Sequence, residues 1–162
     1  MVTDRPGVIE TERLLLRLAE REDVGSLARA AETRTTDRIS ATIERQPAVW
    51  ARHGYGLWVI VPRMEMRLVG WCGLKPGSTP DKPEITYGLE PESRRQGFAT
   101  EAVKAVIAFA LVNPDIQSVW GATATGNLAS AAVMKRAGMA LETAGVLDGV
   151  PSFIFRVARS TL

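Results

Sequence analysis

The sequence predicts a mixed α/β fold in which one strand is followed by helices and then by strands that alternate with helices. Three observations carry this prediction. Some short segments place apolar residues at every second position, others place them at helical spacing, and stretches rich in glycine and proline separate the two kinds. A chain of 162 residues buries about 68–70% of its unfolded surface, so we expect a single domain over residues 1–162.

The composition limits the classes of function. A hydrophobic content of 46% with 23% charged residues is ordinary for a globular protein, and a formal net charge of +2 is too small to favour nucleic acid. No apolar run is long enough to span a membrane, and residues 1–7 contain no apolar secretion segment. The single cysteine rules out an intrachain disulfide. We therefore expect a cytoplasmic protein with no nucleic-acid or membrane partner.

The first third of the chain is predicted to form a strand and two helices. Leucines at every second position of residues 14–18 indicate a half-buried strand. Apolar residues at helical spacing indicate a helix over residues 24–31 and a second helical segment over residues 39–53. We expect Pro47 to interrupt this second segment, because proline has no backbone N–H, and Gly54 to end it.

The middle of the chain is predicted to contain a hairpin and a strand–turn–helix unit. The β-rich residues 55–61 and 68–74 predict an antiparallel hairpin. The proline- and glycine-rich residues 75–83 predict a surface loop. Alternation over residues 84–89 then predicts the fourth strand, and the apolar stripe of residues 100–112 predicts the helix that follows it.

The last third of the chain is predicted to form two strands with a helix between them. Residues 118–123 are rich in residues that favour strands, and alternating apolar residues over 153–157 mark the final strand. Between them a helix is expected over residues 128–137. Asn127 suits its N-cap, and Gly138 suits the left-handed position at its C-terminal end.

The turn that follows residues 84–89 has the features of a phosphate site. A helix start carries unpaired amides and the positive end of the helix dipole. Gly97 lets the backbone approach a ligand closely, Ala99 is small, and Arg94 and Arg95 add positive charge. The same residues also suit a solvated surface turn, so the turn by itself leaves both interpretations open.

Residues 94–99 resemble the Gln/Arg-x-x-Gly-x-Gly/Ala signature of the GNAT family of N-acetyltransferases, which binds the pyrophosphate of acetyl-CoA. The rest of the chain is similar to the RimJ/RimL-like branch, which acetylates the N-termini of ribosomal proteins. Two departures are mild, since Ala99 replaces the commoner second glycine and Met139 replaces the usual aromatic residue. The resemblance is carried, in the expected order, by residues 10–17, 54–58, 68–74, 84–89, 127–130 and 135–139.

The resemblance implies the GNAT fold, a mostly antiparallel mixed sheet that is flanked by helices and splayed between its fourth and fifth strands. Acetyl-CoA, as co-substrate, would enter the gap and pair with free amides near Gly88, Leu89 and Glu90. The amides of residues 96–100 would hold its pyrophosphate. The residues assigned to cofactor binding in this way are Gly88, Leu89, Glu90, Arg94, Arg95, Gln96, Gly97, Phe98, Ala99, Thr100 and Asn127.

Acetyl transfer from a thioester to an amine needs a neutral amine, a stabilised oxyanion and a proton for the departing thiolate. The resemblance implies that Glu84 acts as general base through water and that Ser130 donates a proton to the thiolate. A backbone N–H near Leu89 would meet the oxyanion. Glu84 can equally be explained as a charged residue at the start of a strand without a catalytic role. Ser130 can equally be explained by local hydrogen bonding to the backbone in the first turn of a helix.

Other chemistry-bearing residues have simpler explanations. His53, the single histidine, is a residue type suited to a base, but it precedes a loop glycine, where a solvated histidine is common. Cys72 lies in an apolar strand and is expected to be a buried thiol. Trp50, Trp58 and Tyr87 could line an acceptor pocket, although aromatic residues in strands usually belong to the core. No residues have metal-ligand spacing, and no dinucleotide or P-loop motif is present.

The sequence therefore predicts an N-acetyltransferase that moves an acetyl group from acetyl-CoA to a primary amine by direct transfer in a ternary complex. The acceptor would be a protein N-terminus or a small-molecule amine, and the protein a monomer or a homodimer. The alternative is a non-catalytic acyl-CoA-binding regulatory module, which the joint presence of Glu84, Asn127 and Ser130 disfavours. Residues 33–54 should shape the acceptor site, but they contain no motif that identifies the acceptor.

Overall fold

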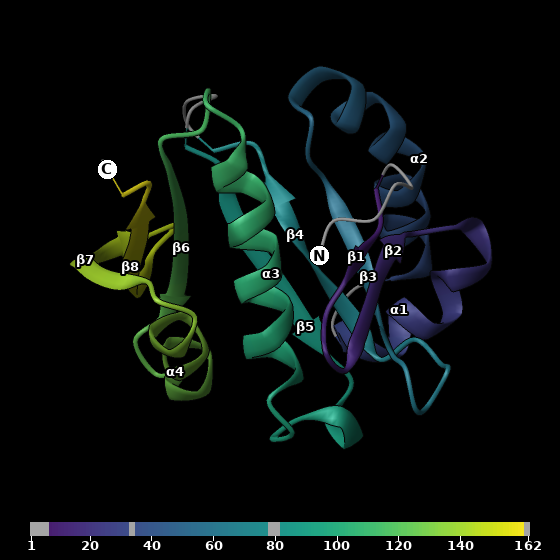
Figure 1. Ribbon diagram of the computed structural model, residues 1–162. Helices are drawn as coiled ribbons and strands as arrows, with labels where there is room; N and C mark the ends of the chain where they lie inside the picture. Colours follow the sequence, from purple (N-terminus) through teal and green to yellow (C-terminus); the bar gives the residue numbers. More distant parts are fainter. Residues whose placement is uncertain (1–6, 33–34, 78–81, 161–162) are drawn as a thin grey trace.

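The computed structural model describes residues 7–32, 35–77 and 82–160. Within this part of the chain one sheet of eight strands has the order β1-β2-β3-β4-β5-β6-β8-β7 (Figure 1). The strands are β1 (Ile9–Glu10), β2 (Leu14–Leu18), β3 (Leu57–Pro62), β4 (Gly70–Lys75), β5 (Glu84–Leu89), β6 (Ser118–Ala124), β7 (Ala140–Leu147) and β8 (Val150–Ala158). The helices are α1 (Val24–Ala31), α2 (Thr36–His53), α3 (Phe98–Val112) and α4 (Leu128–Arg136), with short 3₁₀ turns η1 (Arg21–Asp23) and η2 (Pro91–Ser93).

Helices cover both faces of the sheet. Alternate residues of a strand point to opposite faces, so a strand with apolar residues at successive positions needs packing partners on both sides. Trp58 and Ile60 of β3 belong to the core that includes the buried stripe of α3, whereas Val59 and Val61 belong to a second core with α1 and α2. Figure 1 shows α3 lying along the centre of the sheet. The stripe predicted for this helix is buried as expected, at Ala102, Val103, Val106, Ile107 and Ala110.

The sheet opens between β5 and β6, as the family resemblance predicted for the fourth and fifth strands. Within the described residues these parallel strands pair only at Glu84 and Trp120, whereas β4 and β5 pair along the whole of β5. A hydrogen bond from Trp120 N to Pro83 O (2.9 Å) closes the narrow end. The opening therefore widens toward the carboxyl end of β5, where the turn into α3 begins.

The prediction that Pro47 interrupts the second helix was wrong, because α2 runs unbroken from Thr36 to His53. A proline inside a helix removes one hydrogen bond and costs about 3 kcal/mol. Here the burial of Ile39 and Ile43 beneath the helix opposes that cost, and Gly54 caps the helix in the left-handed region at φ +71°. Tertiary packing thus outweighs the local proline signal.

Two strands lie outside the predictions, and one predicted loop is shorter than expected. The strand β1 has only two residues, and every residue of β7 is exposed, so neither shows an apolar alternation. Lys75 belongs to β4 rather than to the loop predicted over residues 75–83, part of which (78–81) lies outside the described residues.

None of the helices in the described ranges is long and apolar enough to cross a membrane.

Candidate active site

The turn into α3 presents unpaired backbone amides. Arg95 and Gly97 both adopt left-handed backbone, with φ of +60° and +80°, which lets the chain reverse sharply before the helix. The first hydrogen bond at this end of α3 runs from Glu101 N to Gly97 O (3.0 Å). The amides of Phe98, Ala99 and Thr100 therefore have no partner within the helix, and such an end favours an anion.

The side chains of this turn have three different environments: one is hydrogen-bonded to neighbouring segments, one is exposed to solvent and one is buried. Arg94 Nε donates to Leu89 O (3.1 Å), and its Nη2 pairs with Glu32 (3.2 Å), so Arg94 braces the end of β5. Arg95 is exposed beside the helix start. The Phe98 side chain is buried in the core, so Phe98 offers a ligand only its backbone. Of the two predicted arginines, Arg95 is the better placed to meet a phosphate from solution.

The amides at the end of β5 alternate between β4 and the opening of the sheet. Glu90 N donates to Val69 O (2.8 Å), so the expectation of a free amide at Glu90 is wrong. Residues two apart on an antiparallel strand direct their amides to the same neighbour, so Gly88, which pairs with Trp71, also faces β4. The amide of Leu89, between them, faces the opening and is the one available to a ligand.

The Glu90 side chain anchors the segment between β5 and the turn. It is buried and accepts hydrogen bonds from the Arg67 guanidinium and from Ser93 Oγ (2.9 Å). Burial raises the pKa of Glu90, but the bonds from Arg67 and Ser93 outweigh it, so the net pKa lies below its usual value. This carboxylate stays charged and holds η2 in place. Because η2 directly precedes residues 94–97, it also positions the turn into α3.

Glu84 lies at the narrow end of the opening, on the face of the sheet that α1 and α2 cover. Its Oε1 pairs with Lys75 Nζ (3.1 Å), and its side chain is one-third exposed. It lines a cavity of about 240 Å³, whose other walls include Trp120, Leu147 and Ile154. The Glu84 carboxylate therefore faces a space that is bounded mainly by apolar residues and by Lys82.

Ser130 lies on the opposite face, where it meets a side chain from β5. Its backbone N–H donates to Asn127 Oδ1 (3.1 Å), which confirms the predicted N-cap. Its hydroxyl Oγ lies 2.7 Å from the Tyr87 hydroxyl, which also donates to Ser130 O (3.0 Å). Burial raises the pKa of Tyr87, so this phenol stays protonated near neutrality. The pair joins β5 to α4 across the opening.

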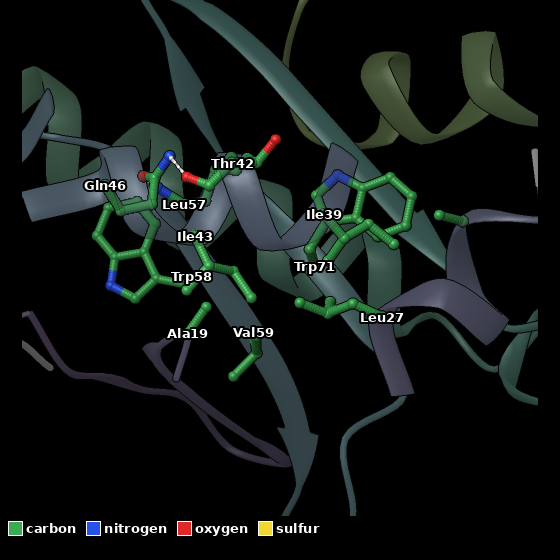
Figure 2. A pocket seen from close by; sticks show the side chains of 11 residues that line it. Ala19, Leu27, Ile39, Thr42, Ile43, Gln46, Leu57, Trp58, Val59 and Trp71 are labelled. Carbon is green, nitrogen blue, oxygen red and sulfur yellow. Dashed lines mark hydrogen bonds between the residues drawn. The ribbon is translucent and has the colours of Figure 1, made fainter. Parts of the chain in front are cut away.

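An apolar cavity of about 40 Å³ lies beneath α1 and α2 (Figure 2). Leu27, Ile39 and Ile43 line it from the helices, and Trp71 lines it from β4. The Trp71 ring also covers Gly88, since a Cβ at Gly88 would collide with it. Trp71 thus lies between this cavity and Gly88 near the carboxyl end of β5, on the same face as Glu84.

The remaining predicted candidates lie in the core or away from the opening. Cys72 is fully buried, and burial raises the pKa of its thiol, so it is not a nucleophile. Trp50 and Trp58 pack edge to face with centroids 4.8 Å apart, as core residues. His53 stacks on Tyr55 at the end of α2. No group of side chains in the described part of the chain is arranged to hold a metal ion.

Sequence reasoning missed two contributions to this region. Tyr87 was considered only as pocket or core, although its place three residues after Glu84 puts it on the opposite face. The sequence predicted no role for Arg13, yet this residue donates from Nη1 to Gln96 O (2.7 Å) in the turn. No local signal marks Arg13, because its partners lie more than eighty residues along the chain.

Comparison with known proteins decides the family. A sequence model of the Acetyltransferase (GNAT) domain matches residues 13–140, most of the chain. The chain belongs to the GNAT family. This membership confirms the predicted GNAT fold and the predicted class of acetyltransferase, with acetyl-CoA as the co-substrate.

A curated relative of this GNAT chain is the FsC-acetyl coenzyme A-N(2)-transacetylase of Aspergillus fumigatus. The two are 32% identical over 94 residues, which are 53% of this chain. The chain spans 39% of that relative's length. The relative therefore supports the family but covers too little to carry over its whole activity.

Solved structures share the fold at low sequence identity. A GNAT-family acetyltransferase from Bacillus anthracis superposes with a TM-score of 0.81 at 16% identity, covering 94% of this chain and 98% of that one. An acetyltransferase from Agrobacterium tumefaciens gives 0.79 at 20% identity, with 97% of both chains covered. RimL, a ribosomal alpha-N-protein acetyltransferase in complex with coenzyme A, gives 0.75 at 17% identity, covering 93% and 97%. The chain thus shares its fold with RimL as well as with the other two acetyltransferases.

Proposed function

We propose that this GNAT domain transfers the acetyl group of acetyl-CoA directly to a primary amine in a ternary complex. One observation carries the proposal: Glu84 of β5 and Ser130 of α4, which contacts Tyr87 of β5, lie on opposite faces of this strand beside the opening of the sheet. A base on one face and a proton donor on the other suit a thioester held between them. A module that only bound the cofactor would need neither group.

The cofactor would be held mainly by backbone. The unpaired amides from Phe98 to Thr100, the left-handed Gly97 and the exposed Arg95 would bind the pyrophosphate. The Leu89 amide would pair with the pantetheine arm or meet the oxyanion of the tetrahedral intermediate. Gln96 would contribute its backbone amide, and Asn127 would lie beside the pantetheine arm. Gly88, Glu90 and Arg94 would contribute indirectly, by fixing the conformation of the end of β5.

The reaction would begin with removal of a proton from the acceptor. Glu84 takes that proton through a water molecule, and the neutral amine then attacks the thioester carbonyl carbon. Lys75 Nζ lies 3.1 Å from Glu84 Oε1, so this ion pair orients the carboxylate at the edge of the cavity. An α-amine, with a pKa of about 7.7–8.0, needs less help from a base than a lysine amine at about 10.4.

The reaction would end on the other face of β5. When the carbon–sulfur bond breaks, the thiolate of coenzyme A takes the proton of the Ser130 hydroxyl. The Tyr87 hydroxyl, 2.7 Å away, orients Ser130 and can restore its proton. The nitrogen of the tetrahedral intermediate loses its second proton to water. The amide and the thiol therefore form with the net release of one proton to solvent, once Glu84 and Ser130 have returned to their starting states.

The acceptor would be a protein N-terminus or a small-molecule amine, met in the cytoplasm. RimL, which shares the fold, is named as an alpha-N-protein acetyltransferase, and this supports a protein N-terminus as the first class to test. The cavity beside Glu84 is bounded by Leu147 of the β7–β8 hairpin and Trp120, so it can take an extended chain end or a small molecule.

The test is a panel of amines with acetyl-CoA, scored by release of the coenzyme A thiol and by the mass of the acetylated product. The panel contains short peptides with free N-termini, free amino acids, polyamines and aminoglycosides. We expect at least one class to be acetylated, and Glu84→Gln to abolish most of that activity. Acetyl-CoA binding with no product from any class would instead support the non-catalytic module.

A further inference from the structure

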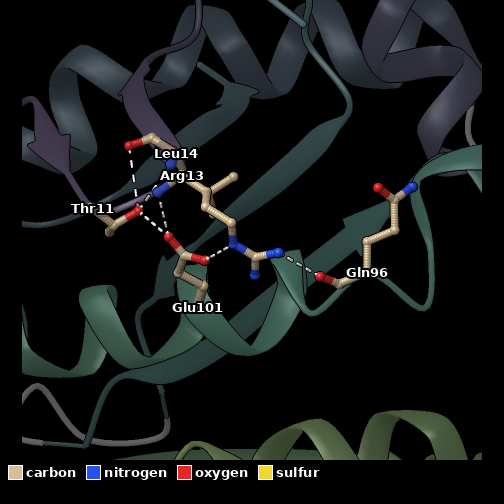
Figure 3. Close-up of polar contacts among 5 residues, drawn as sticks. All are labelled: Thr11, Arg13, Leu14, Gln96 and Glu101. Carbon is tan, nitrogen blue, oxygen red and sulfur yellow. Dashed lines mark hydrogen bonds and ion pairs between the residues drawn. The ribbon is translucent and has the colours of Figure 1, made fainter. Parts of the chain in front are cut away.

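The segment between β1 and β2 reaches across to the start of α3. Thr11 and Arg13, which both lie between β1 and β2, contact Glu101 of α3, and Arg13 also contacts Gln96 of the turn (Figure 3). The contacting residues are more than eighty positions apart in sequence. A connection of this length is made only by the folded chain, so it fixes the turn relative to the sheet.

The Glu101 carboxylate is the centre of this connection. Its Oε1 accepts from Thr11 Oγ1 (2.6 Å) and from Arg13 N (2.9 Å), and its Oε2 accepts from Arg13 Nε (2.7 Å). Burial raises the pKa of Glu101, but these bonds outweigh it, so the net pKa is lowered and the group is charged. A bare carboxylate in the first turn of α3 would repel a phosphate, and Arg13 neutralises it.

The other end of the Arg13 guanidinium holds the turn itself. Its Nη1 donates to Gln96 O (2.7 Å), and the group lies over the Phe98 ring, 5.0 Å from the ring centre. In a trans peptide the C=O of one residue and the N–H of the next point in opposite directions. Holding the Gln96 carbonyl toward Arg13 therefore turns the Gly97 N–H away from it.

We propose that Arg13 is a positioning residue for the pyrophosphate of acetyl-CoA, an assignment that rests on the proposed function of the turn. It fixes the Gln96–Gly97 peptide so that the Gly97 amide joins those of α3 in one anion site. It also cancels the charge of Glu101 beside that site. A planar guanidinium can do both at once, because it donates to two acceptors in a rigid geometry, and a lysine ammonium cannot.

The experiment compares two acetyl donors, acetyl-CoA and S-acetylpantetheine, which has the thioester arm but no pyrophosphate. We expect Arg13→Gln to raise the Kd of acetyl-CoA by about tenfold, the loss of one or two charge-assisted hydrogen bonds. The Kd of S-acetylpantetheine, measured at millimolar concentration by NMR titration, should stay within about twofold. Arg13→Lys should recover little of the loss, since it keeps only the charge.

The matched control is Arg63→Gln, which removes another exposed ion pair of the same edge, between Arg63 Nη2 and Glu10 Oε2 (3.1 Å). This variant should bind both donors as the wild type does. Equal weakening of both donors by Arg13→Gln, unchanged acetyl-CoA binding, or full recovery in Arg13→Lys would each overturn the proposal. A wild-type protein that does not bind acetyl-CoA would instead refute the proposed function.

Discussion

The two sides of the opening between β5 and β6 are built in different ways. On the proposed cofactor side, which consists of residues 94–100 and the Leu89 amide, the candidate binding groups are backbone amides fixed by the helix start and by Arg13. On the proposed acceptor side, which consists of Glu84 and its cavity, the candidate groups are side chains from separate strands. If both proposals hold, side-chain substitution should change acceptor preference and leave cofactor binding unchanged.

The largest effect should come from the acceptor side. Glu84→Gln removes the proposed base with little change of shape, so kcat should fall by about 10²–10⁴ while the Kd of acetyl-CoA is unchanged. The deficit should shrink as pH rises past the pKa of the acceptor amine, because a neutral amine needs no base. Rates of both proteins across the pH range measure this.

The control for Glu84 is Glu142→Gln, which alters an exposed carboxylate of β7 near Arg156. It should leave the pH profile as it is in the wild type. Full activity of Glu84→Gln at every pH would place the base elsewhere, and His53 or an unassisted water would then be the better candidate.

A smaller effect is expected at the proton donor on the other face. Ser130→Ala should lower kcat by about 10²-fold and Tyr87→Phe by about tenfold, with the Kd of acetyl-CoA nearly constant. The N-cap of α4 uses the backbone N–H of Ser130, so the alanine variant keeps it and should keep the melting temperature. A normal kcat in Ser130→Ala would show that solvent protonates the thiolate.

A third effect should appear on the cofactor side alone. Gly97→Ala places a side chain at φ +80°, beside Arg13 Nη2 (3.1 Å), and should raise the Kd of acetyl-CoA by about tenfold. Gly138→Ala makes the same left-handed demand at φ +92°, with no atom near its new Cβ. Both should lose about 1 kcal/mol of stability. Equal Kd values for acetyl-CoA in the two variants would show that Gly97 does not take part in cofactor binding.

The smallest effect concerns stability in acid. Glu101 has a lowered pKa in the folded protein, so its bonds stabilise the fold above the unfolded pKa of about 4.3 and are lost as pH falls through the folded value. Glu101→Gln should therefore cost about 1–3 kcal/mol at pH 7 and progressively less below pH 4. Urea unfolding at several pH values measures this. A constant difference between the two proteins down to pH 2 would contradict it.

Much of the fold could be predicted from the sequence, because its central elements carry strong local patterns. The strand at residues 14–18 and the fourth strand at residues 84–89 were predicted with their observed bounds. The failures have physical causes. Pro47 is tolerated because packing outweighs its local cost, and every residue of β7 is exposed, so this strand has no apolar pattern.

Parts of the candidate site also differ in how far the sequence could predict them. A glycine, a strand before it and a helix after it are local features, so the turn at Gly97 could be found from sequence. The amide direction at Glu90 could not, because it depends on the register with Val69 of the segment before β4. Nor could the contacts of Tyr87 with Ser130 or of Arg13 with Glu101, which only the tertiary fold brings together.

The most direct test of the central claim is thermal unfolding with matched concentrations of acetyl-CoA, ATP and NADH. If the turn into α3 is an acetyl-CoA site, acetyl-CoA at a hundredfold excess over its Kd should stabilise the protein by about 2.7 kcal/mol. ATP and NADH should give much smaller shifts, since they lack the pantetheine arm, which we propose pairs with β5. No shift with millimolar acetyl-CoA, or an equal shift with ATP, would contradict the account.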